Sequence, residues 1–338
     1  MPAIHETAYP RIKPNLSPKE LKELFTPNEE ELILLDCKTK KSMPVTRFGF
    51  MLMLKCYQYL GRPVKLKTID VSIKNFVAEK IGIDPLIDLS GYSKLTRHRH
   101  IQSIRDFLEI NPDKKERRNI MKKVALTAAT NKENLADIIN CVIDELVKSK
   151  FELPAFQKLV RLGRAARTVI NNVNYQRIFH ALSDEQKEVL DVITGVTSAP
   201  ENNHITMTWS QLKTEPEKPT TNKVRTFIKH VNDLRVLRQE ININLDFITP
   251  SRIEQLRDEA LTADLADIKE MRSVKRYALA TILIYMQTAA AVDDLVNICI
   301  GWIRSIETSA KKKLEDYRLQ QADKTDQYIL ILYNTLLA

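Results

Sequence analysis

The side chains best suited to chemistry in this sequence are basic, and they are concentrated in a few stretches. Between Lys94 and Lys123, ten lysines and arginines stand against four acidic residues. Lysine, arginine, histidine and glutamine side chains donate hydrogen bonds to phosphate oxygens and to base edges in DNA. This local excess predicts a contact with DNA, and the alternative is a solvated helix face that binds nothing.

One helix expected over residues 94–108 can present such side chains. With 3.6 residues per turn, Ile101, Ile104 and Leu108 fall on one side, which can dock on a core. The other side and its flanks carry the residues that we expect to contact DNA: His98, Arg99, Gln102 and Arg105. Arg97 falls on the apolar side in the first turn, where it can pair with a carboxylate or hold a phosphate. We therefore predict a recognition helix here.

Two later stretches repeat this pattern. In a long helix expected from Pro154 to Leu182, basic residues recur at every third position: Lys158, Arg161, Arg164 and Arg167. An apolar seam accompanies them: Leu159, Leu162, Ala166, Val169 and Val173. From Lys150 to Arg177, six basic residues meet a single acidic one, Glu152. A weaker third group follows polar residues at a helix start that can contact phosphates, and it comprises Lys223, Arg225 and Lys229.

Catalytic and metal chemistry are not expected from the motifs. The sequence contains no glycine-rich dinucleotide loop, no Walker loop, no G-x-S-x-G and no H-E-x-x-H. His98 and His100 point in different directions on a helix, and the adjacent Asp293 and Asp294 also diverge, which favours a cap or an ion pair. The four cysteines are far apart, as expected of buried residues in a reducing cytosol. We predict no catalytic residue, no metal ligand and no cofactor in this chain.

Composition favours long helices with short connections. The 338 residues include only 7 glycines, and 43% are hydrophobic, which is enough for large cores. The net charge of +9 is by itself compatible with nucleic acid or with chance. The N-terminus lacks the basic and apolar regions of an export signal. The longest uncharged run, 277–292, is shorter than the roughly 18 residues that span a bilayer. We expect an all-α, cytoplasmic protein without a membrane segment.

Capping and breaking residues mark the helices. Ser17–Glu20, Thr26–Glu29 and Ser183–Gln186 have the form of capping boxes, the first two with proline at the first helical position. A strongly apolar helix begins at Pro44 and ends at Gly61. Further helices are expected over 68–81, 94–108, 132–147, 154–182 and 221–239, from 112 onward, and from 250 to the end with interruptions. Between 194 and 221 the periodicity fails, which predicts a loop or a short strand over 204–209.

These elements group into three expected regions. Residues 1–150 and 151–245 are expected to form two DNA-binding domains, built as helical bundles with helix-turn-helix-like units. Residues 246–338 are expected to form a long-helix region that serves as a linker or a dimerisation surface, so that a homodimer is a further expectation.

Several segments, in their order along the chain, resemble the N-terminal region of replicative transposases of the Tn-three family. The segments that resemble the family's are Arg47–Phe50 with Leu52, Leu54 and Tyr59–Arg62, then Phe76–Glu79 with Ile81–Ile83, then Tyr92 with Thr96–His100 and Ile104–Arg105. Later segments continue the likeness: Leu153–Pro154 with Leu159, Arg161, Ala165 and Arg167, then Arg276–Leu279 with Asp293–Val296. One departure is Phe107–Ile110, where the family has a glycine and a tyrosine after its basic helix.

The resemblance implies a protein that binds double-stranded DNA at the terminal inverted repeats of a transposon, for DNA transposition and recombination in a bacterial cell. In the family, strand transfer belongs to a magnesium-dependent DDE domain much further along, which has no counterpart here. The resemblance therefore implies that this chain is not itself an enzyme. The alternatives are a helical protein-interaction scaffold and a truncated transposase that acts as a regulator.

Overall fold

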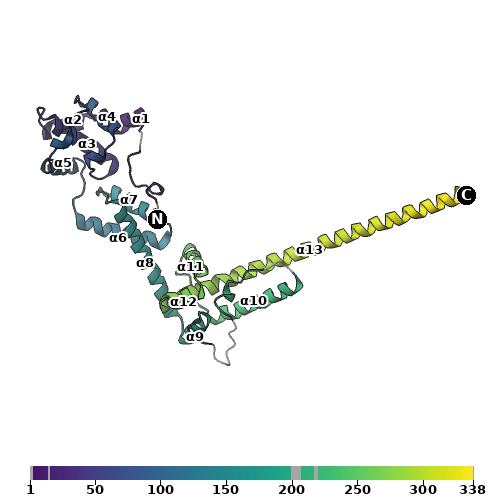
Figure 1. Ribbon diagram of the computed structural model, residues 1–338. Helices are drawn as coiled ribbons and strands as arrows, with labels where there is room; N and C mark the ends of the chain where they lie inside the picture. Colours follow the sequence, from purple (N-terminus) through teal and green to yellow (C-terminus); the bar gives the residue numbers. More distant parts are fainter. Residues whose placement is uncertain (1–2, 14–15, 199–206, 217–219, 338) are drawn as a thin grey trace. The chain divides into compact units, whose positions relative to one another are not determined.

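The computed structural model describes residues 3–13, 16–198, 207–216 and 220–337, and it is all-α as predicted (Figure 1). These ranges contain thirteen α-helices, four short 3-10 helices and no strand. The 3-10 helices are η1 (Ile4–Glu6), η2 (Leu66–Thr68), η3 (Leu89–Gly91) and η4 (Gln211–Lys213). The chain divides into two compact units, residues 1–171 and 172–338. The division into three functional regions stays a prediction.

The first half of unit 1 is built around one strongly apolar helix that is buried along most of its length. Its helices are α1 (Pro18–Phe25), α2 (Glu29–Lys38), α3 (Pro44–Leu60), α4 (Val71–Lys80) and α5 (Lys94–Phe107). The others pack around α3, whose residues 48–57 are all buried. A helix with so little polar surface is stable at the centre of a core. Lys55 of α3 lies in that core because its ammonium group pairs with the buried Glu31 carboxylate at 3.2 Å.

The second half of unit 1 has its own apolar core. It consists of α6 (Lys114–Asn131), α7 (Leu135–Lys148) and the beginning of α8 (Phe156–Ala181). The buried side of α7 runs through Ile138, Val142 and Leu146. Gly163 of α8 faces this side so closely that a Cβ atom there would lie 2.5 Å from Leu135 Cδ1. A side chain at that position would therefore displace the Leu135 side chain.

Unit 2 packs around the beginning of a single long helix. It contains the end of α8, α9 (Asp184–Ile193), α10 (Thr221–Glu240), α11 (Pro250–Thr262), α12 (Leu265–Glu270) and α13 (Ser273–Leu337). Figure 1 shows α10 lying along the first part of α13, where residues 277–284 are buried. The Trp209 indole is buried beside them and donates to the Ala263 carbonyl at 3.0 Å. Further along α13, every residue from 303 to 336 is exposed.

The long helix α13 is also apolar enough, over 18 residues, to cross a membrane by length and composition alone. The mean hydropathy of that window is 1.4, and it is the one such helix among the described residues. Its apolar residues 277–284 are buried in the core of unit 2. Of the whole 18-residue window, 39% is buried within the protein.

The side-chain hydrogen bonds at the helix starts show which of the predicted capping boxes are present. Ser17 accepts from the Glu20 amide and Ser183 from the Gln186 amide, as predicted. The box predicted at Thr26–Glu29 is wrong, because α2 begins two residues later, with Asn28 as its cap. The Glu31 carboxylate reaches back to the Asn28 amide at 2.9 Å, which Glu29 cannot do. A loop or a short strand was predicted over 204–209. Residues 207–209 form no strand, and residues 204–206 lie outside the described residues.

Candidate nucleic-acid interface

The helix predicted to contact DNA is α5, and its apolar side is docked in the first core of unit 1. Ser93 caps its N-terminus by accepting from the Thr96 amide at 3.1 Å. Ile101 and Ile104 are buried against α3, as the helical wheel indicates. One side of α5 is thereby held in place, which leaves the other side for a partner.

His100 anchors the beginning of this buried side. The Tyr92 hydroxyl lies 2.6 Å from His100 Nδ1, and the Phe50 ring meets the imidazole edge to face, with centroids 4.9 Å apart. Burial lowers the pKa of His100 to about 4 and raises that of Tyr92 above its usual value. The imidazole is therefore neutral at physiological pH, and its Nδ1 can accept a hydrogen bond from the Tyr92 hydroxyl.

The exposed side of α5 carries three of the predicted contact residues. His98, Arg99 and Gln102 are exposed, and Gln102 donates to the Asp106 carboxylate one turn later at 3.0 Å. Within the described part of the chain, no ion pair holds His98 or Arg99. Their donors are available to phosphate oxygens or base edges.

The other two predicted residues of α5 are engaged within the protein. The Arg97 guanidinium donates to the Val64 carbonyl at 2.9 Å, so neither a carboxylate nor a phosphate is needed to hold it. The half-buried Arg105 guanidinium pairs with the Glu152 carboxylate at 2.6 Å. Burial by itself lowers the pKa of Arg105, but its interactions with Tyr57 and Glu152 outweigh that effect and raise it.

The basic row of α8 lies in solvent at its beginning. Lys158, Arg161 and Arg164 are exposed, and Arg167 is half-buried. None of the four forms an ion pair with a described residue. The predicted apolar seam holds for Leu159 and Ala166, which are buried, and for Leu162, which is half-buried. It fails for the last two positions, Val169 and Val173, which are exposed because they lie beyond the core formed with α6 and α7.

The third group lies on the exposed side of α10 in unit 2. Lys223, Arg225 and Lys229 are exposed, while Val224, Phe227 and Val231 of the same helix are buried. The structure thus gives α10 the amphipathic form expected of a surface helix.

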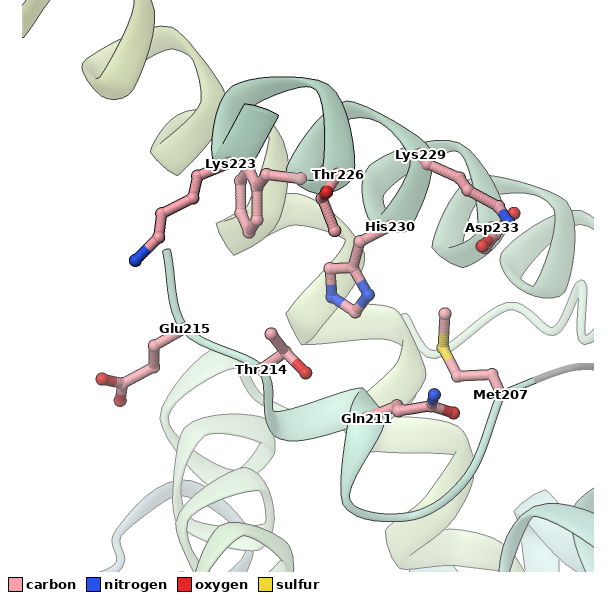
Figure 2. Close-up of a pocket in the computed structure, with 10 residues that line it drawn as sticks. Met207, Gln211, Thr214, Glu215, Lys223, Thr226, Lys229, His230 and Asp233 are labelled. Carbon is pink, nitrogen blue, oxygen red and sulfur yellow. The ribbon is translucent and has the colours of Figure 1, made fainter. Parts of the chain in front are cut away.

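Two of these lysines border a pocket of about 450 Å³ between α10 and residues 207–215. Figure 2 shows Lys223 and Glu215 at one end and Lys229 with Asp233 at the other, with the His230 ring between them. Burial lowers the pKa of His230, although Asp233 opposes this. Because a carboxylate accompanies the lysine at each end and the imidazole is neutral, this pocket is less suited to an anion than the open faces of α5 and α8 are.

Metal ligation has no candidate here. Among the residues that the structure describes, no three histidine, cysteine or acidic side chains converge to hold an ion. The prediction of buried cysteines holds for Cys56 alone, since Cys141 and Cys299 are half-buried and Cys37 is exposed. Burial raises the pKa of the Cys56 thiol to about 12, which suits an inert core residue.

Sequence reasoning missed the residues that hold the contact helices in place. Tyr92 and Val64 form hydrogen bonds with His100 and Arg97 of α5 from outside the helix. Glu152 pairs with Arg105 of α5, although the two residues are 47 positions apart in the sequence. Glu152 carried a usable signal, since it is the single acidic residue in the basic stretch 150–177.

Comparisons with known proteins agree with the resemblance seen in the sequence. Residues 1–166 match a family model described as a domain of unknown function, DUF4158. The chain is 25% identical over 336 residues to the transposase for transposon Tn1546 of Enterococcus faecium, covering 94% of this chain and 33% of that protein. It is 22% identical over 310 residues to the transposase for transposon Tn501 of Pseudomonas aeruginosa, covering 88% and 30%. The chain thus spans about a third of the length of these curated relatives, and it is related to transposases over most of its own length.

Proposed function

We propose that this chain recognises the terminal inverted repeats of a transposon, as the sequence-specific DNA-binding part of a transposase. The observation that carries the proposal is the placement of α5, whose Ile101 and Ile104 are fixed in a core while Arg99 on the opposite side is exposed to solvent. A rigid helix with exposed arginine and histidine donors is the form that reads a major groove. The relation to two transposases supports this partner over other polyanions.

Each basic group has a distinct part in the proposed binding. In a helix-turn-helix-like unit in which α3 is the element that α5 packs against, α5 lies in the major groove, where Arg99 and Gln102 reach base edges. The exposed residues of α8 bind phosphates beside that groove, and the group on α10 of unit 2 also binds phosphates. The protein is in this case cytoplasmic and associated with DNA, and magnesium-dependent strand transfer is a task for other parts of a transposase.

Selection from a random library of duplexes tests the proposal, because it requires no assumed target sequence. The full chain is expected to enrich one motif, and that motif is expected in inverted copies on either side of the gene. Affinity for the selected duplex, measured by fluorescence anisotropy, should fall about a thousandfold or more between 50 and 200 mM salt if six or more phosphates are contacted. Recovery of no motif, with equal affinity for a shuffled duplex, would contradict the proposal.

A helical protein-interaction scaffold is the second candidate, and one observation favours it. The exposed far part of α13 carries the consecutive apolar residues Ile329–Tyr333, on more than one side of the helix. An exposed apolar surface of this kind marks a protein contact, for which a second copy of the chain is one partner. Sedimentation of the chain with and without DNA separates the two functions, because a scaffold self-associates without showing any sequence preference.

A further inference from the structure

The segment 150–154 connects the two cores of unit 1. On one side, the Leu153 amide donates to the Gly61 carbonyl, and the Asn111 amide donates to the Lys150 carbonyl, both at 2.9 Å. On the other side, Phe151 and Leu153 are buried in the core formed by α6, α7 and α8. The segment therefore belongs to both halves of the unit.

Glu152 makes the polar contacts at the centre of this segment. Its carboxylate pairs with Arg105 from the last turn of α5, and its backbone carbonyl accepts from Arg117 of α6 at 3.2 Å. The side chains of Arg105 and Glu152 are only 27% and 19% exposed, so water screens this pair less than a surface pair. The nearby Tyr57 hydroxyl has its pKa raised to about 12 by burial, and the Glu152 carboxylate adds to that rise. The pair with Arg105 holds the Glu152 side chain at a fixed point beside α5.

This contact joins the two helices that the proposed function places on DNA. Arg99 lies six residues before Arg105 on α5, and Lys158 lies six residues after Glu152. The path from Arg99 through the ion pair to Lys158 is at most about 40 Å, comparable to one turn of B-DNA, roughly 34 Å. The exposed residues of both helices can therefore contact one duplex within about one turn.

We propose that Glu152 is a positioning residue, which sets the spacing between the α5 and α8 contacts on DNA by holding Arg105. This inference rests on the proposed function and adds a role for Arg105, which acts as part of the frame and does not contact DNA. The pair thereby selects a DNA duplex in which the segment contacted by α5 and the segment contacted by α8 are separated by one fixed distance.

The experiment compares the full-length wild type with Glu152→Gln, which keeps the size of the side chain and removes its charge. The control is Glu79→Gln, which removes a carboxylate from an exposed pair with Lys80. The probes are the duplex selected by the wild type and derivatives with one to five base pairs inserted between the segments contacted by α5 and α8. Hydroxyl-radical footprints of Arg99→Ala and Arg161→Ala identify these two segments.

The wild type and Glu79→Gln should bind the inserted duplexes at least about tenfold more weakly than the parent duplex. Glu152→Gln should bind the parent duplex about tenfold more weakly and lose most of its dependence on the insertion. The double variant Arg105→Glu with Glu152→Arg should regain part of that dependence, because the pair is restored with its charges exchanged. Arg105→Gln should behave as Glu152→Gln does.

Three results would overturn the inference. Tighter binding by Glu152→Gln would mean that the carboxylate merely withholds Arg105 from DNA. An equal loss on all duplexes, with the insertion dependence unchanged, would mean that Glu152 only stabilises the fold. A wild type that does not distinguish the selected from the shuffled duplex would overturn the proposed function as well, whereas the first two results would leave that function standing.

Discussion

The Tyr92 hydroxyl and the His100 imidazole meet at 2.6 Å on the buried side of α5. His100 lies next in sequence to Arg99, the exposed arginine proposed to reach a base edge. The same helical turn thus carries a buried hydrogen bond and the proposed contact with DNA. The orientation of the exposed side of α5 depends on this internal contact.

The stability of unit 1 should depend on pH through His100. Its pKa is about 4 in the folded protein, below its ordinary value of 6.5, so its stabilising effect is complete above pH 6.5 and is lost as the pH falls toward 4. Between pH 7 and pH 5 the free energy of unfolding should fall by roughly 1 to 2 kcal/mol. Urea denaturation followed by circular dichroism measures this difference. In His100→Gln the loss over the same range should be smaller by that amount, and an equal loss in both proteins would contradict the prediction.

Gly163 should tolerate a side chain poorly. In Gly163→Ala the new Cβ would lie 2.5 Å from Leu135 Cδ1, so the buried Leu135 side chain must move within the core, and we expect a loss of about 1 kcal/mol. Gly301→Ala is the control, because a Cβ there meets no atom within 4 Å. Alanine is the better helix former, so that variant should be as stable as the wild type or up to about 1 kcal/mol more stable. Similar urea midpoints for both variants would contradict the packing seen at Gly163.

Asp191 should be needed for the stability of unit 2. Its carboxylate accepts from the buried Arg276 guanidinium and from the Tyr277 hydroxyl, both at 2.9 Å. Asp191→Ala leaves the buried arginine with the Met271 carbonyl but without its carboxylate partner, which should cost about 3 kcal/mol. Both tryptophans of the chain lie in unit 2, and Trp209 is buried, so indole fluorescence in urea follows this unit alone. Asp184 is exposed and pairs with the half-buried Lys187, so Asp184→Ala should cost less than about 1 kcal/mol, and equal losses would refute the role of Asp191.

Local chemistry was sufficient to predict most of the fold. The helix α3 runs from Pro44 to Leu60 as predicted, because proline fixes its start and Gly61, at a φ of 62°, ends it. The start of α2 was misplaced because Thr26 and Asn28 are both good caps. The choice between them depends on Glu31, whose carboxylate reaches the Asn28 amide.

For the candidate site, helix periodicity predicted which side chains of a helix are buried and which are exposed, and nothing more. It correctly separated the buried Ile104 from the exposed Arg99. It could not reveal that Arg105 is paired, because Glu152 approaches it from a segment 47 positions away in the chain. Contacts between residues so far apart in the sequence depend on how the two cores of unit 1 pack together. The residue pattern within one helix carries no information about that packing.

The proposed reading of DNA sequence by the exposed side of α5 can be measured in a single titration. Arg99→Ala is compared with wild type by fluorescence anisotropy on the selected and the shuffled duplex. Arg318→Ala, at an exposed position of α13, serves as the control for the loss of one positive charge. Arg99→Ala should lose about 1 to 3 kcal/mol on the selected duplex and far less on the shuffled one, while Arg318→Ala keeps the wild-type preference. Equal affinities of Arg99→Ala and wild type for the selected duplex would contradict the claim.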